Sequence, residues 1–168
     1  MHFSKTIFAL AVAASASALP VDDVDSTLLA RAGTYTCKPK ENQSSEKSFT
    51  VSDARAVAQA AAGAFEPGKS GDPHKYGNGD NIKWGVKGCD KTGKNKHQLW
   101  EYPIYWDKKG KEWDKNKLSK DQDGKTPLRV VYFQDPGNSN RPKVCGVMTH
   151  SEVDKDFQGK KFFQKCDK

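Results

Sequence analysis

The chain has few apolar residues and no long hydrophobic run. Apolar residues make up 35% of its 168 residues, and the longest apolar stretch runs from Ile7 to about Ala16. A membrane-spanning helix needs roughly 20 apolar residues, and no later stretch approaches that length, which excludes such a helix. Eight Phe, five Tyr and four Trp remain to build a core. One folded domain is therefore expected rather than wholesale disorder.

Cysteine and histidine are also scarce, with four of each. No two cysteines stand at C-x-x-C spacing and no two histidines at H-x-x-x-H spacing, which counts against a zinc site. No G-x-S-x-G segment marks a nucleophile, although composition alone does not exclude a Ser/His/Asp triad. The sequence implies no metal and no cofactor, and it contains no internal repeat.

Positive charge is in excess. The chain has 28 basic and 21 acidic residues, a net charge of +7, and an isoelectric point near 9.2. Such a balance favours a polyanionic partner, either nucleic acid or an acidic membrane surface. An acidic protein target is the remaining electrostatic option.

The first 18 residues have the pattern of a secretory signal peptide. Lys5 precedes the apolar run, and Ala16-Ser17-Ala18 is a small-x-small cleavage pattern. Residues 19–31 are acidic and end in Arg31, which indicates a pro-segment trimmed after that arginine; a mature form that begins at Leu19 is the alternative. We expect a secreted protein whose single domain spans residues 32–168.

All four cysteines lie in the expected mature domain. An even number of cysteines in a small exported domain predicts two disulfide bonds. Spacing alone leaves all three connectivities open. The residues concerned are Cys37, Cys89, Cys145 and Cys166.

The pattern of residues predicts one helix followed by strands. Residues 50–64 are rich in Ala, open with Ser and Asp and reach Gly63, which is typical of a helix. Residues 66–81 are a turn-rich connection. Residues 87–96 and 108–125 are too polar to pack and are expected to be ordered surface loops. Short runs rich in β-branched and aromatic residues predict strands over 98–106, 128–133 and 143–150, with further candidates at 161–166 and 82–86. The fold class is α+β.

Three charged side chains stand inside the predicted strands. Alternation along the strands lets one register bring Glu101, Arg129 and His150 onto a shared face. The plain alternatives are that Glu101 forms a satisfied ion pair and that Arg129 is a structural partner. Together the three suit RNA cleavage by transesterification, with His74 as a helper beside Glu101, and a metal is not required. His97 receives no role beyond a surface position.

Four separated segments resemble the active-site segments of the fungal ribotoxins, members of the microbial guanyl-specific ribonuclease superfamily. They are Asp72-Pro73-His74, Leu99-Trp100-Glu101-Tyr102-Pro103, Arg129-Val130-Val131-Tyr132 and Cys145-Gly146-Val147-Met148-Thr149-His150. The resemblance covers residues 32–168.

The resemblance implies a fold. One helix packs on a central antiparallel sheet, with an N-terminal β-hairpin and long basic loops. It also implies two disulfide pairings: Cys37 with Cys166, and Cys89 with Cys145.

The resemblance further implies the roles of the site residues. Glu101 would be the general base and His150 the general acid, while His74 and Arg129 would give electrostatic support. Phe163 looks like the apolar residue that walls the site.

One position departs from the usual ribotoxin pattern. Many members carry Tyr where this chain has Asp72, and a carboxylate there would raise the pKa of His74 and change how His74 and Glu101 divide the work of the base. The connection from His74 to Glu101 is also shorter than in the larger ribotoxins, and that connection helps to select the ribosome.

The activity implied is a single cut in the sarcin–ricin loop of large-subunit ribosomal RNA, which leaves a 2′,3′-cyclic phosphate and stops translation. The partners implied are the ribosome and, during uptake into target cells, acidic phospholipid membranes; the protein is expected to be monomeric, insecticidal and active in the target cytosol. Lysines before the first long strand are candidates for RNA binding, against the alternative of a solubilising surface. They are Lys83, Lys87, Lys91, Lys94 and Lys96.

Two other functions remain open. In one, the protein is a secreted guanyl-specific ribonuclease that degrades RNA broadly; in the other, it is a non-catalytic RNA-binding effector. The basic loops count against the first, and the intact set of Glu101, Arg129 and His150 counts against the second.

Overall fold

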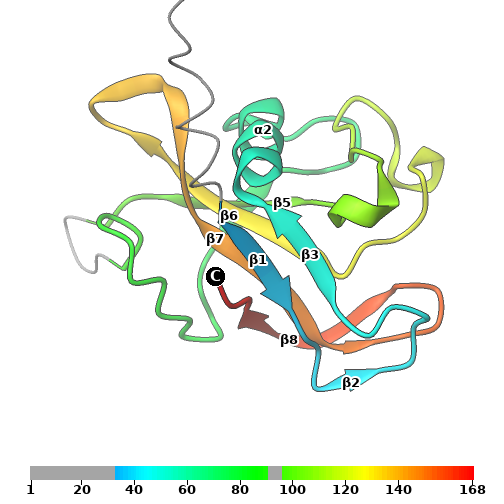
Figure 1. The fold of residues 1–168 in the computed structure, drawn as a ribbon. Helices are drawn as coiled ribbons and strands as arrows, with labels where there is room; N and C mark the ends of the chain where they lie inside the picture. The colour runs from blue at the N-terminus through cyan, green and yellow to red at the C-terminus, as the bar shows by residue number, and fades with distance from the viewer. Residues whose placement is uncertain (1–32, 91–95) are drawn as a thin grey trace, which may run out of the picture. The chain divides into compact units, whose positions relative to one another are not determined.

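A computed structural model describes residues 33–90 and 96–168, and one large β-sheet organises them (Figure 1). The strand order is β2-β7-β6-β5-β4, and β8 pairs with β7. The β2–β7 pair is parallel and the other pairs are antiparallel. The strands of this sheet are β2 (Glu41–Asn42), β4 (His74–Tyr76), β5 (Leu99–Pro103), β6 (Leu128–Asp135), β7 (Asn138–Val153) and β8 (Gly159–Lys165).

Within the described residues, an N-terminal hairpin and one α-helix complete the fold. Strands β1 (Thr34–Cys37) and β3 (Phe49–Ser52) pair antiparallel, and helix α2 (Asp53–Gly63) follows directly. The helix approaches the sheet closely at Gly63, where an added Cβ would lie 2.7 Å from the Tyr102 ring. The expected α+β class, with one helix on an antiparallel-dominated sheet, is confirmed.

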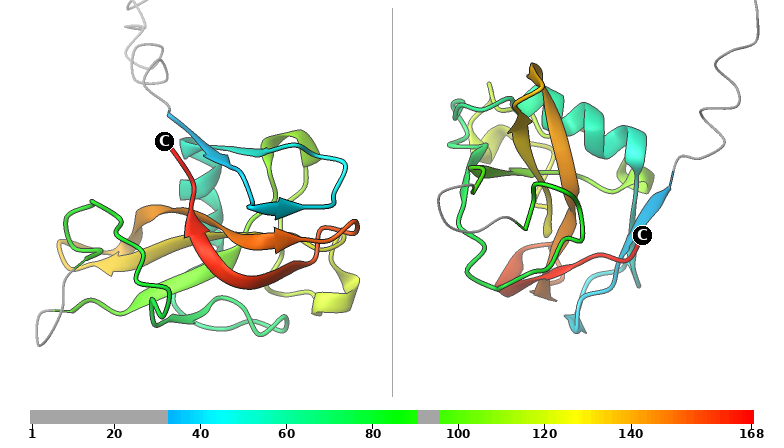
Figure 2. Two further views of the ribbon diagram at one scale, coloured as in Figure 1. Left: turned by 90° about the horizontal axis from the view of Figure 1, so that it is seen from below. Right: turned by 90° about the vertical axis from the view of Figure 1, so that its left-hand side faces the viewer.

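The central sheet is covered on both faces. Figure 2 shows α2 on one side of the sheet and the segment between β4 and β5, drawn in green, on the other. The core on the helix side contains Val130 and Tyr132 of β6, while the core under the green segment contains Val131 and Phe133. Alternate residues of one strand therefore enter different cores.

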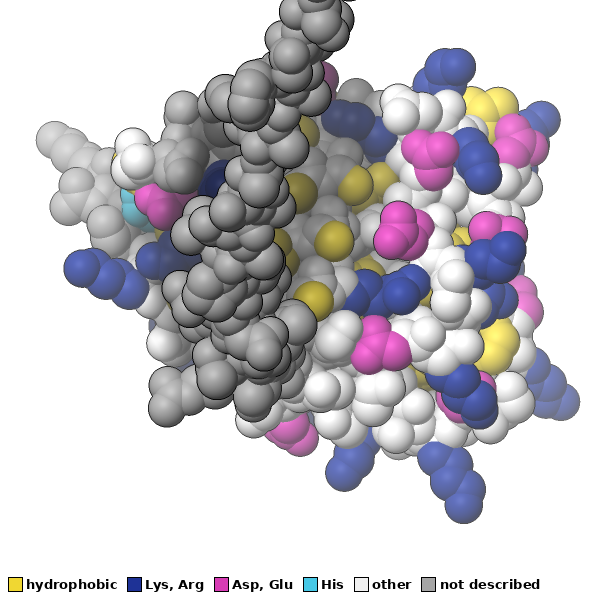
Figure 3. Space-filling view, turned by 45° about the horizontal axis from the view of Figure 1, so that its top comes forward, with side chains coloured by type: hydrophobic (Ala, Val, Ile, Leu, Met, Phe, Trp, Pro, Cys, Tyr) yellow, Lys and Arg dark blue, Asp and Glu magenta, His cyan; other side chains and the backbone are white. Residues whose placement is uncertain are grey.

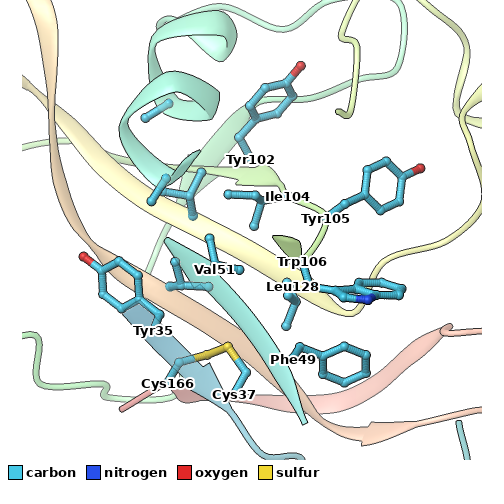
Figure 4. Packing of buried hydrophobic residues seen from close by; sticks show 14 of the residues in the cluster. Tyr35, Cys37, Phe49, Val51, Tyr102, Ile104, Tyr105, Trp106, Leu128 and Cys166 are labelled. Atoms are coloured by element: carbon cyan, nitrogen blue, oxygen red, sulfur yellow. A yellow bond between two sulfur atoms is a disulfide. The ribbon is translucent and has the colours of Figure 1, made fainter. Parts of the chain in front are cut away.

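The core on the helix side is rich in aromatic residues. Phe49 and Trp106 meet edge to face with ring centroids 5.0 Å apart, and the Cys37–Cys166 disulfide lies beside them (Figure 4). Arranged in this way, aromatic rings contribute both buried area and favourable ring geometry. A charged, hydrophilic chain can fold stably because its few large apolar residues gather here.

The structure contains two disulfide bonds, and they are the pairings that the resemblance implies. Cys37 and Cys166 are bonded across a sequence separation of 129, and Cys89 and Cys145 across a separation of 56. The first ties β1 to the end of the chain. The second ties the segment before β5 to β7.

The helix begins later than the sequence pattern suggests. It was expected over residues 50–64, but residues 50–52 belong to β3, where Thr50 lies opposite Thr36 and Val51 opposite Tyr35. Pairing with β1 and burial of Val51 in the core outweigh the weak helical pattern at these β-branched residues.

The strand expected at residues 82–86 is wrong. The backbone N–H groups of Trp84 and Gly85 donate to the carboxylate of Asp90, at 2.8 and 2.7 Å, so the segment folds back on itself instead of joining the sheet. Its apolar residues are buried as loop residues, with Ile82 at 7% and Trp84 at 2% exposure.

Strand β4 was missed because it lies inside the turn-rich stretch 66–81. Only three residues long, it pairs with β5 and sets His74 opposite Glu101. Strands β5 to β8 were expected, with different ends: β5 is shorter than the expected 98–106, and β7 extends well beyond 143–150 at both ends. Strands β1 and β3 form the N-terminal hairpin that the resemblance implies, and β2 was not expected.

The long polar loops are built from local hydrogen bonds. In the 108–125 segment, the amide side chain of Gln122 accepts from the N–H of Asp114 at 3.0 Å and donates to its carbonyl at 2.6 Å. Two short 3-10 helices, η2 (Asp107–Lys109) and η3 (Ser119–Asp121), interrupt this region. The expected signal peptide and pro-segment lie outside the described residues. Among the described residues, no helix is long and apolar enough to cross a membrane.

Removing the terminal disulfide should have a large effect on stability. We expect replacement of Cys37 and Cys166 by Ala to lower the free energy of unfolding by about 4–5 kcal/mol, because the bond closes nearly the whole folded chain and restricts the unfolded state. Urea unfolding measures the change. The Cys89–Cys145 bond closes a shorter loop, so replacing these two cysteines should lower the free energy of unfolding slightly less. A decrease below about 1 kcal/mol on replacing Cys37 and Cys166 contradicts the expectation.

Candidate active site

Four charged or titratable side chains lie along a diagonal of one sheet face. His74 on β4 is directly opposite Glu101 on β5. Glu101 pairs with Val131 of β6, two residues after Arg129. Arg129 pairs with Met148 of β7, two residues before His150. The shared face that the sequence predicts for Glu101, Arg129 and His150 is therefore present, and the register adds His74 to it.

A chain of charges links β4 to β5. Nδ1 of His74 lies 3.0 Å from a carboxylate oxygen of Asp72, and Nε2 of the same ring contacts Oε1 of Glu101. The hydrogen bonds to Asp72 and then to Glu101 raise the pKa of His74 to about 9. His74 is thus an imidazolium at neutral pH, and both of its ring protons are engaged.

Glu101 has one oxygen engaged and one open. The residue is only 7% exposed, and Oε1 contacts His74. Oε2 is buried and has no hydrogen-bond partner among the described residues. A buried carboxylate oxygen without a partner is costly, so this atom is suited to a proton donor on a bound molecule.

Arg129 is anchored by main-chain carbonyls. Its Nη1 donates to the carbonyl oxygens of Thr126 and Leu128, at 3.1 and 2.9 Å. Burial lowers the pKa of the guanidinium, while the charges of Asp72 and Glu101 oppose that change. The rest of the fork can bind an oxyanion, because a guanidinium carries five donors in a fixed plane.

The β7–β8 pair holds His150 on three sides. Its Nδ1 lies 3.1 Å from the carbonyl oxygen of Lys161, so Nδ1 is the donor. The ring of Phe163 packs on the imidazole with centroids 3.9 Å apart. An added Cβ at Gly159 would lie 2.1 Å from the His150 ring. The imidazole is therefore fixed in position, with Nε2 left to exchange a proton.

The environment of His150 disfavours its charged form. Burial lowers its pKa below the usual 6.5, and the nearby charge of Arg129 lowers it further. The two histidines of the diagonal thus shift in opposite directions, since His74 is raised by carboxylates. Opposite shifts in one site are typical of groups with different acid–base tasks.

The candidate RNA-binding lysines are only partly described. Lys83, Lys87 and Lys96 are exposed, whereas Lys91 and Lys94 lie outside the described residues. On the face drawn in Figure 3, basic side chains are interspersed with acidic ones rather than gathered in one patch.

Several residues at the site were not identified from the sequence. Asp80 accepts a hydrogen bond from the backbone N–H of Phe163 at 2.9 Å and so fixes the wall of the site. Lys120 and Lys125 line an open hollow of about 300 Å³ together with Arg129. Gly159 had one available signal, because a glycine inside a strand often marks a close approach of other groups.

The arrangement supplies the elements of metal-independent phosphoryl transfer. It has a buried carboxylate with a free oxygen, a guanidinium held by main-chain carbonyl groups, and an imidazole whose Nδ1 is hydrogen-bonded to a carbonyl oxygen. Within residues 33–90 and 96–168, no group of three or more His, Cys, Asp or Glu side chains is arranged to hold a metal ion.

The sequence is similar to those of known ribonucleases. The sequence profile of the ribonuclease family matches residues 37–167. Ribonuclease mitogillin of Aspergillus restrictus is 30% identical over 172 residues, an alignment that covers 87% of this chain and 90% of its relative. Ribonuclease clavin of Aspergillus clavatus is 29% identical over 152 residues, covering 75% and 81%.

Two solved structures are similar to this one. The solution structure of hirsutellin A from Hirsutella thompsonii matches with a TM-score of 0.65 and 48% sequence identity. The match covers 81% of this chain and 100% of the hirsutellin A chain. The crystal structure of restrictocin, an Aspergillus ribotoxin, has a TM-score of 0.57 and 24% identity over 80% of this chain and 99% of that one, and it shares the fold.

The charge chain through His74 should make stability depend on pH. Its pKa rises from 6.5 to about 9 on folding, so the contribution of His74 is complete below pH 6.5 and is lost as the pH rises through about 9. The free energy of unfolding of the wild type minus that of His74→Gln should therefore be constant at acid pH and fall between pH 6.5 and 9. Urea titrations across pH 5.5–10 test this; a difference that grows with pH contradicts it.

Proposed function

This chain belongs to the fungal ribotoxin family of ribonucleases, and we propose that it is a secreted endoribonuclease that cuts one phosphodiester bond in the sarcin–ricin loop of large-subunit ribosomal RNA. The observation that carries the proposal is the diagonal of Glu101, Arg129 and His150 on one rigid sheet face. Strands hold catalytic groups more rigidly than loops do, which suits a reaction that depends on positioning.

Glu101 is the general base. Its free Oε2 accepts the proton of the ribose 2′-hydroxyl as that oxygen attacks the phosphorus. His74 cannot take the role below about pH 9, because it is already protonated between Asp72 and Glu101. It acts instead as a fixed positive charge that orients the carboxylate.

His150 is the general acid. As the bond from phosphorus to the 5′-oxygen breaks, Nε2 of the imidazolium donates its proton to that oxygen, and the products are a 2′,3′-cyclic phosphate and a 5′-hydroxyl. The carbonyl of Lys161 keeps Nδ1 protonated and so directs the exchangeable proton to Nε2. Phe163 covers the ring and keeps it from turning.

Arg129 stabilises the crowded phosphorus centre. The two non-bridging oxygens of the phosphate gain negative charge as the 2′-oxygen adds to phosphorus, and a guanidinium can bind them through two parallel N–H groups. Its anchoring to the main chain means that little reorganisation is needed when the charge develops. Lys120 adds positive charge beside it, whereas Lys125 is paired with Asp156 at 2.7 Å.

Exposed lysines before β5 attract the ribosome. Lys83, Lys87 and Lys96 can form phosphate contacts that raise the rate of encounter with a large polyanion. The same charge suits an acidic phospholipid surface during uptake into a target cell, after which a monomer acts in the cytosol. An insecticidal role is part of the same proposal, which rests on the family resemblance.

A general guanyl-specific ribonuclease is the second candidate. It would use the same catalytic groups, so the site alone does not separate the two functions. The substrate does separate them, because a ribotoxin discriminates intact ribosomes from naked RNA.

Intact ribosomes should yield one discrete product. At low enzyme concentration we expect a single 3′-terminal fragment of large-subunit ribosomal RNA, because docking presents one loop to the site. Gel electrophoresis of the extracted RNA measures it, with Glu101→Gln as the inactive control. A smear of fragments from ribosomes and naked RNA alike would favour the broad ribonuclease.

Loss of the general acid should be severe and visible in the pH profile. His150→Gln should reduce cleavage of a dinucleotide by at least about a hundredfold, since general acid catalysis contributes roughly 10²–10⁴. For the wild type, kcat/KM should fall as the pH rises through the pKa of His150, which burial and the charge of Arg129 hold below the usual 6.5. Near-normal cleavage by the variant, at an unchanged thermal midpoint, would move the acid elsewhere.

A further inference from the structure

A second hollow lies at the other end of β6 from Arg129, and we propose that it binds a base of the RNA strand at a distance from the bond that is cut. It has a volume of about 310 Å³, and its lining includes His97, Phe133, Asp135 and two lysines, Lys87 and Lys143. The proposal rests on the proposed function, in that it names where that substrate extends. No role was expected for His97 beyond a surface position.

The centre of the hollow is a rigid aromatic stack. The rings of His97 and Phe133 are parallel within 6°, with centroids 4.6 Å apart. Phe133 is only 2% exposed, so it supports the stack from below, and the half-buried His97 presents the outer face. At Gly88, with φ of +100°, an added Cβ would lie 2.7 Å from the Phe133 ring, so main chain closes one side of the stack.

A flat aromatic face of this kind suits a nucleobase. Every base has a π-face, and stacking on aromatic side chains is a common means of binding single strands. The stack is already formed in this structure, so binding requires no rearrangement of His97. A base can add to it as the next layer.

The charges around the stack fit the rest of a nucleotide. Lys87 and Lys143 line the hollow, and Nζ of Lys143 lies 5.9 Å from the Phe133 ring centroid, so both can approach a backbone phosphate. Asp135 also lines it and is fixed by the N–H of Gly137 at 3.0 Å. A carboxylate repels phosphate but accepts from a base amino group, which favours adenine, guanine or cytosine over uracil.

The position fits a strand that crosses the active site. Phe133 lies four residues from Arg129 on the same face of β6, a separation of about 13 Å. Figures 1 and 2 both show the chain that precedes β5 beside the β6–β7 hairpin, and residues of both segments line the hollow. The segment between β4 and β5 covers Val131 on the face between them, so RNA that is held at Arg129 meets the stack after passing over that segment.

Binding can be tested apart from catalysis. Fluorescein-labelled deoxyribonucleotide hexamers lack the 2′-hydroxyl, so the enzyme cannot cut them, and fluorescence anisotropy reports binding alone. We expect oligodeoxyadenylate to bind the wild type more tightly than oligodeoxythymidylate. His97→Ala should weaken binding of the adenine hexamer roughly tenfold, as expected for the loss of one stacking surface.

Matched variants separate stacking from charge and from folding. His97→Phe keeps a flat ring and should keep most of the affinity. Lys143→Ala should weaken binding several-fold, whereas Lys155→Ala, which removes the same charge from the exposed turn between β7 and β8, should not. Thermal midpoints check folding, and if His97→Ala unfolds, the comparison of Lys143→Ala with Lys155→Ala decides.

The outcomes distinguish this proposal from the proposed function. Equal binding by the wild type and a folded His97→Ala, or by the two lysine variants, overturns the base site even if ribosomes are cut as expected. Weaker binding of the adenine hexamer by His97→Ala and Lys143→Ala, with unchanged binding by Lys155→Ala, supports the base site even if cleavage is not confined to one bond. On RNA, the ratio of hexanucleotide to dinucleotide cleavage should fall in His97→Ala by a similar factor.

Discussion

The alternation of side chains along β6 is the constraint on which both the core and the site depend. Even-numbered residues such as Val130 and Tyr132 pack under α2, while odd-numbered ones face the other way. That second face has to hold Arg129 at one end and buried apolar residues at the other. A slip of one residue in register would put the guanidinium into the helix-side core. The catalytic geometry is therefore fixed by the same pairing that builds the hydrophobic interior.

The electrostatic balance of the site follows from what surrounds each histidine. His74 sits between two carboxylates and stays charged, whereas His150 is buried near a guanidinium and gives up its proton more easily. One imidazolium is thus a permanent counter-charge for Glu101, and the other is available for proton transfer. The Asp72 side chain strengthens this division because it fixes the second nitrogen of His74.

Much of the fold and the site could be predicted because the signals are local. The β-branched and aromatic runs in β5 to β7 mark strands directly, and alternation places Glu101, Arg129 and His150 on one face. Strand β4 could not be predicted, since three residues inside a Gly- and Pro-rich stretch give no periodic pattern and pair only because β5 is beside them.

The other misses have two physical causes, a competing local hydrogen bond and contacts between segments that are far apart in the chain. Residues 82–86 look like a strand by composition, yet the carboxylate of Asp90 takes their N–H groups. Gly159 matters through His150, nine positions earlier, and the stack of His97 on Phe133 joins segments far apart in the chain. No local pattern encodes such partners, because each depends on which strands lie side by side.

The burial of the cysteines has a consequence for how long the enzyme survives where it is proposed to work. Each cysteine is at most 4% exposed, with Cys37 fully covered. Reduction of a disulfide requires a thiolate to reach one of its sulfur atoms, so glutathione in a reducing cytosol has no direct path to either bond while the protein stays folded. The cross-links then persist for kinetic reasons, even where the redox potential favours their loss. Reduction has to wait for the chain to open, and the working lifetime of the folded enzyme is set by its rate of unfolding.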